Sequence, residues 1–210
     1  MTVQQPESPK AYGWKSAQPT NSVDYCKAAI AKHLSRLGCK RVLDIGCGNG
    51  AMTSQLAADG FEMTAIEPDR DGFTIATQTH PGIHFENRGV YDNLDDLGIF
   101  DAVISSEVIE HLFDPSALVK AAWSRLPKNG VLIITCPYYG YVKNLVLSLG
   151  NRWDDHHQPA RIGGHIKLWS RATMVSFLSS SGFDVDAVGG AGRFAPIWKS
   201  MVVVAKKKSG

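Results

Sequence analysis

The stretch that most constrains the fold is Arg41-Val-Leu-Asp-Ile-Gly-Cys-Gly-Asn-Gly50. Its first half, in which apolar residues surround Asp44, predicts a short buried strand, and glycines then follow at alternate positions. The next segment, 51–58, has helix-forming composition. A strand, a glycine turn and a helix begin a nucleotide-binding βαβ unit, because a tight turn without Cβ atoms lets a ligand approach the backbone.

Asp44 stands two residues before the first glycine of this turn and narrows the class of ligand. A phosphate favours a helix N-terminus that has no carboxylate beside it, so Asp44 would repel a pyrophosphate. The same carboxylate can accept hydrogen bonds from an ammonium group. We therefore expect a ligand with a cationic end at Asp44, Gly46, Cys47 and Gly48, and S-adenosylmethionine meets that description. The alternative is a structural glycine turn with a buried capping aspartate.

A second acidic residue, Glu67, ends the next predicted strand, 61–66, and follows Gly46 by 21 positions. The ribose-binding carboxylate of a nucleotide-binding βαβ unit comes roughly 20 residues after the glycines. A carboxylate there can accept hydrogen bonds from both ribose hydroxyls, so Glu67 is predicted to bind the ribose. The alternative is a surface glutamate that begins the helix after Pro68.

Strand-like and helix-like segments alternate through most of the chain, which is typical of a parallel sheet with helices on both faces. After the first two strands, further strand-like runs occur at 83–86, 100–105 and 131–135. Two last runs, 183–188 and 197–205, are joined by a short link and predict an antiparallel edge. The fold class is therefore α/β.

Length and composition fit one such domain, since 44% of the 210 residues are hydrophobic. Residues 1–21 are polar and contain three prolines, and they predict a mobile N-terminal arm. Its aromatic residues Tyr12 and Trp14 either close over a ligand or pack on the domain surface. Residues 22–210 are expected to form a single domain, with an insertion at about 137–169 that acts as a substrate lid.

Charge and hydropathy limit which binding partners are expected, and the cysteine content indicates the redox compartment. A net charge of +2 is too small to argue for nucleic acid or an anionic membrane, and no apolar run approaches the roughly 20 residues of a membrane span. The N-terminus does not resemble a signal peptide, and four cysteines without C-x-x-C spacing predict free thiols in a reducing compartment. We expect a cytoplasmic protein that acts on a small molecule; a homodimer is left open.

The stretch from Val42 to Gly50 resembles the first motif of the class I S-adenosylmethionine-dependent methyltransferases. The resemblance implies a seven-stranded Rossmann-like sheet, mostly parallel with an antiparallel C-terminal edge and with helices on both faces. It also implies that Val90 and Tyr91, just past the third strand, meet the adenine ring. Ser106 and Glu107, which follow the fourth strand, are candidates for contact with the methionine end of the cofactor.

Glu107, Glu110 and His111 form a second motif, at the carboxyl end of the fourth strand, where open α/β sheets bind ligands. On a helical turn their i, i+3, i+4 spacing places all three side chains on one face. Two carboxylates and an imidazole so close together shift one another's pKa values unless they share a cation. A divalent metal would supply that charge, with a fourth ligand from elsewhere in the chain.

The run 107–112, the tripeptide 135–137 with tyrosines after it, and the run 165–170 resemble two groups of methyltransferases. One is the ubiquinone-biosynthesis O-methyltransferase family, and the other is the small-RNA 3′-terminal 2′-O-methyltransferase family. Resemblance to the second implies a metal site formed by Glu107, Glu110, His111 and His165. Oxygen and nitrogen ligands suit Mg²⁺, Mn²⁺ or Zn²⁺. If no metal binds, His111 or His165 is the candidate general base.

The sequence therefore predicts an enzyme that transfers the methyl group of S-adenosylmethionine to a small-molecule acceptor, with a hydroxyl oxygen favoured. Transfer to nitrogen or carbon is an alternative that needs no metal. An RNA 2′-hydroxyl is a further alternative, disfavoured because no basic face with interleaved aromatic residues is evident. A non-catalytic cofactor-binding module and a dehydrogenase are the rivals from other classes. His156 and His157, within the expected lid, have no assigned role.

Overall fold

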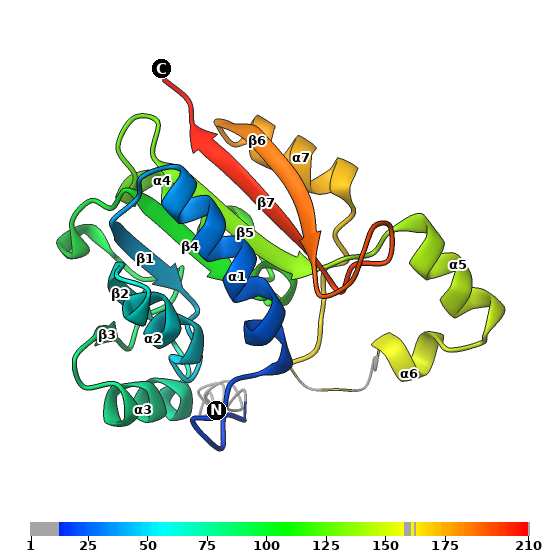
Figure 1. Cartoon of the computed structure of the whole chain (residues 1–210), viewed down its shortest axis with the longest axis horizontal. Helices are drawn as coiled ribbons and strands as arrows, with labels where there is room; N and C mark the ends of the chain where they lie inside the picture. Colours follow the sequence, from blue (N-terminus) through cyan, green and yellow to red (C-terminus); the bar gives the residue numbers. More distant parts are fainter. Residues whose placement is uncertain (1–12, 158–160, 162, 210) are drawn as a thin grey trace, which may run out of the picture.

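A computed structural model describes residues 13–157, 161 and 163–209. Seven strands form one sheet in the order β3-β2-β1-β4-β5-β7-β6 (Figure 1). The parallel strands are β1 (Arg41–Ile45), β2 (Glu62–Ile66), β3 (His84–Glu86), β4 (Ala102–Ser106) and β5 (Val131–Pro137). Strand β7 (Ser200–Lys207) runs antiparallel to both β5 and the edge strand β6 (Phe183–Ala191). The predicted mostly parallel sheet with an antiparallel C-terminal edge is confirmed.

Two layers of helices cover the sheet, and alternate strand residues serve one layer or the other. Val42 joins a core with helices α1 (Asn21–Arg36) and α2 (Ala51–Ala58), whereas Leu43 joins a core with α4 (Ser116–Arg125) and α7 (Arg171–Ser180). This alternation follows from the period of two in a strand. The remaining helices are α3 (Arg70–Thr79), α5 (Tyr141–Leu149), α6 (Trp153–His157) and the 3₁₀ helices η1 (Asp95–Leu97) and η2 (Ile109–His111).

Side chains fix where several helices begin. The Asp69 carboxylate accepts hydrogen bonds from the backbone of Asp71 and Gly72 and caps α3. Ser170 and Thr173 form a capping box at the start of α7. Helix α4 begins at Ser116, where the Asp114 carboxylate accepts a hydrogen bond from the Ser116 amide at 2.9 Å.

The segment expected to form a lid contains α5 and α6, which project from the carboxyl edge of the sheet beyond β5 (Figure 1). Several large apolar side chains on α5 are exposed, among them Val146 at 63% and Leu149 at 80%. Residues 158–160 and 162 of this segment, and residues 1–12 of the expected N-terminal arm, lie outside the described residues. Tyr12 is therefore among the residues left without a description.

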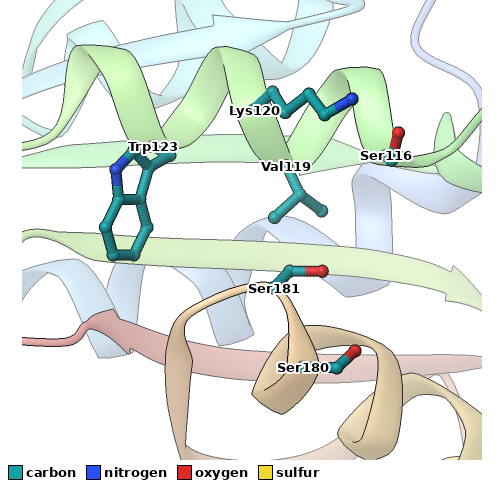
Figure 2. Close-up of a pocket in the computed structure, with 6 residues that line it drawn as sticks. All are labelled: Ser116, Val119, Lys120, Trp123, Ser180 and Ser181. Carbon is teal, nitrogen blue, oxygen red and sulfur yellow. The ribbon is translucent and has the colours of Figure 1, made fainter.

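A shallow depression of about 370 Å³ lies between α4 and the end of α7, on the face of the sheet that these two helices cover (Figure 2). It is lined by Ser116, Val119, Lys120, Trp123, Ser180 and Ser181. Lys120 is the single charged group in that described lining, so the depression offers little chemistry.

Within the described part of the chain, no helix has both the length and the hydropathy required to cross a bilayer.

Phe183 begins β6 and is fully buried, with its ring 5.4 Å from that of Trp123. We predict that Phe183→Ala lowers the free energy of unfolding by about 3–5 kcal/mol, because it removes a large core side chain and leaves a cavity. Phe194→Ala, at a residue that is 73% exposed, is the control and should change it by less than about 0.5 kcal/mol. Urea unfolding followed by circular dichroism measures both, and equal losses would contradict the assignment of the core.

Candidate functional site

The glycine turn after β1 adopts a backbone that other residues rarely reach. Gly46, Gly48 and Gly50 have φ angles of 79°, 57° and 76°, so a side chain at any of them would be strained. The Gly46 and Cys47 amides both donate to the Ile66 carbonyl, at 2.9 and 3.1 Å. These bonds fix the turn against the end of β2, and α2 begins directly after it.

Asp44 lies beneath the turn and is 1% exposed. Its Oδ2 accepts a hydrogen bond of 2.7 Å from the Thr53 hydroxyl of α2, so the carboxyl joins β1 to the helix after the turn. Burial raises the pKa of Asp44 to about 6. The contact with an ammonium group predicted for Asp44 stays a prediction.

Glu67, the predicted ribose ligand, is hydrogen-bonded to the same turn. Its Oε2 accepts from the Gly48 amide at 2.7 Å, and its Oε1 accepts from the Asp69 amide at 2.9 Å. The residue is 7% exposed, and burial raises the pKa of its carboxyl to about 7. The Glu67 carboxyl therefore bridges the glycine turn and the start of α3, beside the surface predicted to bind the cofactor.

The two residues predicted to meet the adenine ring differ in their surroundings. Val90 is partly buried and packs against the core, whereas Tyr91 is 64% exposed. The Tyr91 hydroxyl accepts a 3.3 Å hydrogen bond from the Asp114 amide, so its ring reaches toward the start of α4. Their contact with adenine stays a prediction.

Glu107 departs from the arrangement that the spacing predicts. Its φ of 57° is left-handed, and its carboxylate turns toward β5, where Oε1 accepts from the Thr135 hydroxyl at 2.9 Å. The Ser106 hydroxyl lies 2.9 Å from the same Thr135 oxygen. Burial raises the pKa of Glu107 to about 7. The expected shared helical face of Glu107, Glu110 and His111 is wrong, because only Ile109–His111 is helical and the left-handed residue reverses the direction of the Glu107 side chain.

Glu110, His111 and His165 do come together, from η2 and from the segment before α7. Their nearest ligand atoms lie within 4.8 Å of one another, and Glu107 is not in this group of described residues. His111 Nε2 is 3.9 Å and His165 Nε2 is 4.0 Å from Oε1 of Glu110. These distances are too long for hydrogen bonds, so the three groups face a common point without bonding to one another.

The backbone and Tyr139 orient the two imidazoles. His111 Nδ1 lies 3.2 Å from the Gly164 carbonyl, and His165 Nδ1 lies 2.9 Å from the Tyr139 hydroxyl. With each Nδ1 held in this way, each Nε2 is directed toward Glu110. Glu110 itself is fully buried, and neither of its carboxyl oxygens has a hydrogen-bond partner among the described residues.

Without a cation, this cluster is driven toward neutrality. Burial, assisted by the charge of Glu107, raises the pKa of Glu110 well above its usual range. Burial, assisted by His111, lowers the pKa of His165 to about 4, and burial also lowers the pKa of His111. Both imidazoles are therefore neutral at neutral pH, and they present lone pairs rather than positive charges.

Helices α5 and α6 reach the cluster through Tyr139, which the sequence did not single out as a site residue. Its ring stacks on His157 at 5.5 Å and lies 6.3 Å from the ring of His156. Lys143 Nζ lies 5.3 Å from the center of the Tyr139 ring. The run of tyrosines after β5 was the available signal. The structure thus places the two unassigned histidines beside the cluster, on its lid side.

The fold and this turn define a nucleotide-binding methyltransferase architecture of class I. The profile of the methyltransferase domain family matches residues 23–188, and the chain belongs to that family of S-adenosylmethionine-dependent methyltransferases. A ubiquinone biosynthesis O-methyltransferase from Azorhizobium caulinodans is 30% identical over 150 residues, which cover 63% of this chain and 58% of the relative. The chain spans about half the length of the curated relatives it matches.

Solved structures share the fold at low sequence identity. Magnesium protoporphyrin IX methyltransferase from Synechocystis PCC 6803, with bound SAH (S-adenosylhomocysteine), has a TM-score of 0.69 at 17% identity and covers 94% of this chain and 91% of its own. The methyltransferase domain of bacterial CtHen1-CN has a TM-score of 0.65 at 20% identity, with coverage of 86% and 97%. These likenesses concern the fold.

Because burial raises the pKa of Glu67 above that of an unfolded glutamate, the folded protein retains a proton that the unfolded chain releases. This contribution to stability is present at acidic pH and is lost as the pH rises through about 7. We predict that the free energy of unfolding falls between pH 5 and pH 8. In Glu67→Gln this decrease should be smaller than in the parent protein, by up to about 3 kcal/mol. Urea unfolding across this range measures it.

Glu62→Gln, at the exposed start of β2, the strand that ends just before Glu67, is the matched control for this pH series. If the stability profiles of the parent protein and Glu67→Gln stay parallel across the range, the shift assigned to Glu67 is wrong.

Proposed function

We propose that this chain transfers the methyl group of S-adenosylmethionine to a hydroxyl oxygen of a small-molecule acceptor. The observation that carries the proposal is the group formed by Glu110, His111 and His165 at the carboxyl edge of β4, beside the glycine turn of β1. Neutral imidazoles and a buried carboxyl suit the activation of a hydroxyl group, which needs a proton acceptor or a cation close to its oxygen.

On the cofactor side, we assign Asp44, Gly46, Cys47 and Gly48 to the methionine end and Glu67 to the ribose. The Glu67 carboxylate already holds the Gly48 amide, so a ribose beside it would lie against the glycine turn. Val90 and Tyr91 are assigned to the adenine ring, and Ser106 and Glu107 to the methionine end. Membership of the methyltransferase family supports the choice of cofactor.

The residues of the cluster fit a divalent metal. Glu110 has two buried oxygens without partners, and a buried carboxylate in that state is costly unless a cation or hydrogen bond compensates it. The two Nε2 atoms face it while each Nδ1 is anchored, which is the outer-shell arrangement of histidines that bind metals. We assign Glu110, His111 and His165 as ligands of Mg²⁺, Mn²⁺ or Zn²⁺, with Glu107 as the fourth only if it leaves Thr135. Such an ion, when bound, supplies a Lewis acid that lowers the pKa of an acceptor hydroxyl.

The residues of the chain carry the remaining steps. If no metal binds, the acceptor hydroxyl loses its proton to His165 Nε2 or His111 Nε2; if these two nitrogen atoms hold a metal, their lone pairs are occupied and the proton leaves to solvent. In either case the acceptor oxygen attacks the methyl carbon in line with the leaving sulfur. The carbon–oxygen bond forms as the carbon–sulfur bond breaks, and the sulfonium becomes a neutral thioether. The enzyme contributes proximity and orientation, and a water-poor site favours a step in which the sulfonium loses its charge.

The similarity to ubiquinone biosynthesis O-methyltransferases supports an oxygen acceptor in a small molecule. An RNA 2′-hydroxyl is the second candidate acceptor, since the implied ligand set came from the resemblance to the small-RNA methyltransferases. The net charge of +2 disfavours it, because binding to the phosphate backbone depends on basic side chains. A small molecule is therefore the acceptor class that we favour.

We predict that the purified protein binds Mn²⁺, measured by titration calorimetry, and that His165→Ala and Glu110→Gln weaken this binding at least tenfold, because each removes a ligand. His84→Ala is the matched control: His84 pairs with Glu86 on β3, away from the cluster, and its loss should leave the affinity unchanged. Absence of Mn²⁺ binding, or equal affinity in His165→Ala and the parent protein, would show that the cluster is not a metal site.

We predict that a panel of small phenols and catechols contains acceptors that receive radiolabelled methyl from S-adenosylmethionine. Chelation should lower the rate at least tenfold, and added Mn²⁺ or Mg²⁺ should restore it. Unaltered turnover after chelation would leave the histidines as bases and exclude the metal. Methylation restricted to amines or to RNA would contradict the proposal that the acceptor is a hydroxyl group of a small molecule.

A further inference from the structure

Residues 13–20 lie across the glycine turn and lead into α1. The Asn49 side chain, which is 2% exposed, donates from Nδ2 to the carbonyl oxygens of Ser16 at 3.0 Å and Gln18 at 2.8 Å. A buried amide within the glycine turn therefore holds this segment in place. Figure 1 shows the dark blue segment beside α3, below the end of the sheet that carries the turn.

The indole of Trp14 lies directly against this turn. A Cβ on Gly48 would overlap ring atoms Cζ2 and Cη2 of Trp14, and a Cβ on Gly72 would lie 2.8 Å from its Cδ1. The same position beside Gly72 is 3.2 Å from Cγ of Glu67 and 3.2 Å from the Gly48 carbonyl oxygen. Trp14, Gly48, Gly72 and Glu67 therefore share one small region, and the absence of side chains at both glycines admits the indole.

We propose that Trp14 is a cofactor-contacting residue, which forms the outer wall of the nucleoside site beside Glu67. This inference rests on the proposed function, in which Glu67 binds the ribose and Gly48 lines the cofactor. An indole offers a broad apolar face at little cost in conformational entropy, and aromatic rings stack well on nucleobases. Asn49 holds the carbonyls of Ser16 and Gln18 in the same segment, so the wall is already in place when the cofactor enters, which reduces the ordering cost of binding.

The test is a calorimetric titration of the full chain with S-adenosylhomocysteine. Trp14→Ala should weaken binding about tenfold, as loss of an aromatic stacking partner does, and Trp14→Phe should keep most of the affinity. Lys15→Ala, at an exposed neighbour in the same segment, is the matched control and should bind like the parent protein.

Tryptophan fluorescence gives a second readout, since a ring in contact with the cofactor changes its emission on binding. The change induced by S-adenosylhomocysteine should be lost in Trp14→Phe and kept in Trp153→Phe, whose ring lies on α6. Unaltered affinity in Trp14→Ala, or an unchanged fluorescence response in Trp14→Phe, overturns the assignment of Trp14.

Glu67→Ala separates this inference from the proposed function. If Glu67→Ala binds S-adenosylhomocysteine as tightly as the parent protein, the ribose site itself is wrong. If Glu67→Ala binds at least tenfold more weakly while Trp14→Ala is unaltered, the ribose site stands and only the role of Trp14 is overturned.

Discussion

The parallel pairing of β1 with β4 is the constraint on which the rest of the site depends. Asp44 pairs with Ile104 in this ladder, so the turns that follow the two strands emerge side by side at one edge of the sheet. They are in contact there, since a Cβ on Gly46 would lie 2.6 Å from a methyl group of Val108. The order of strands also reverses between β1 and β4, and open α/β sheets bind their ligands at such a switch point.

At this edge of the sheet, the buried carboxyl of Glu110 is the group on which the proposed metal site depends. Burying a carboxylate without partners opposes folding, because water solvates its charge well and the protein interior does not. The two imidazoles directed at it cannot relieve that cost by hydrogen bonding at 3.9 and 4.0 Å, but a cation among the three groups would. This geometry agrees with the proposed metal site, and Tyr139, at the start of the 137–169 segment, hydrogen-bonds to His165 of the cluster.

Local patterns in the sequence predicted the strands, the glycine turn and Glu67, because periodicity and short spacings determine them. The left-handed backbone at Glu107 and the bond of its carboxylate to Thr135, 28 residues away, were missed, since no local pattern indicates either of them. Insertion of β7 between β5 and β6 depends on long-range pairing that no local pattern encodes. His165 was found only through resemblance to known families, because Tyr139 and the fold bring it to Glu110. Trp14 was singled out, but its place on Gly48 required the structure.

The most direct measurement is a crystal structure of the protein with S-adenosylhomocysteine and Mn²⁺, with data collected at the manganese absorption edge. We predict an anomalous peak bonded to Glu110 and to Nε2 of His111 and His165, with the ribose hydroxyls on Glu67. A cofactor bound at the glycine turn with no anomalous peak at Glu110 would contradict the metal centre. A cofactor bound away from the glycine turn would contradict both the cofactor site and the proposed function.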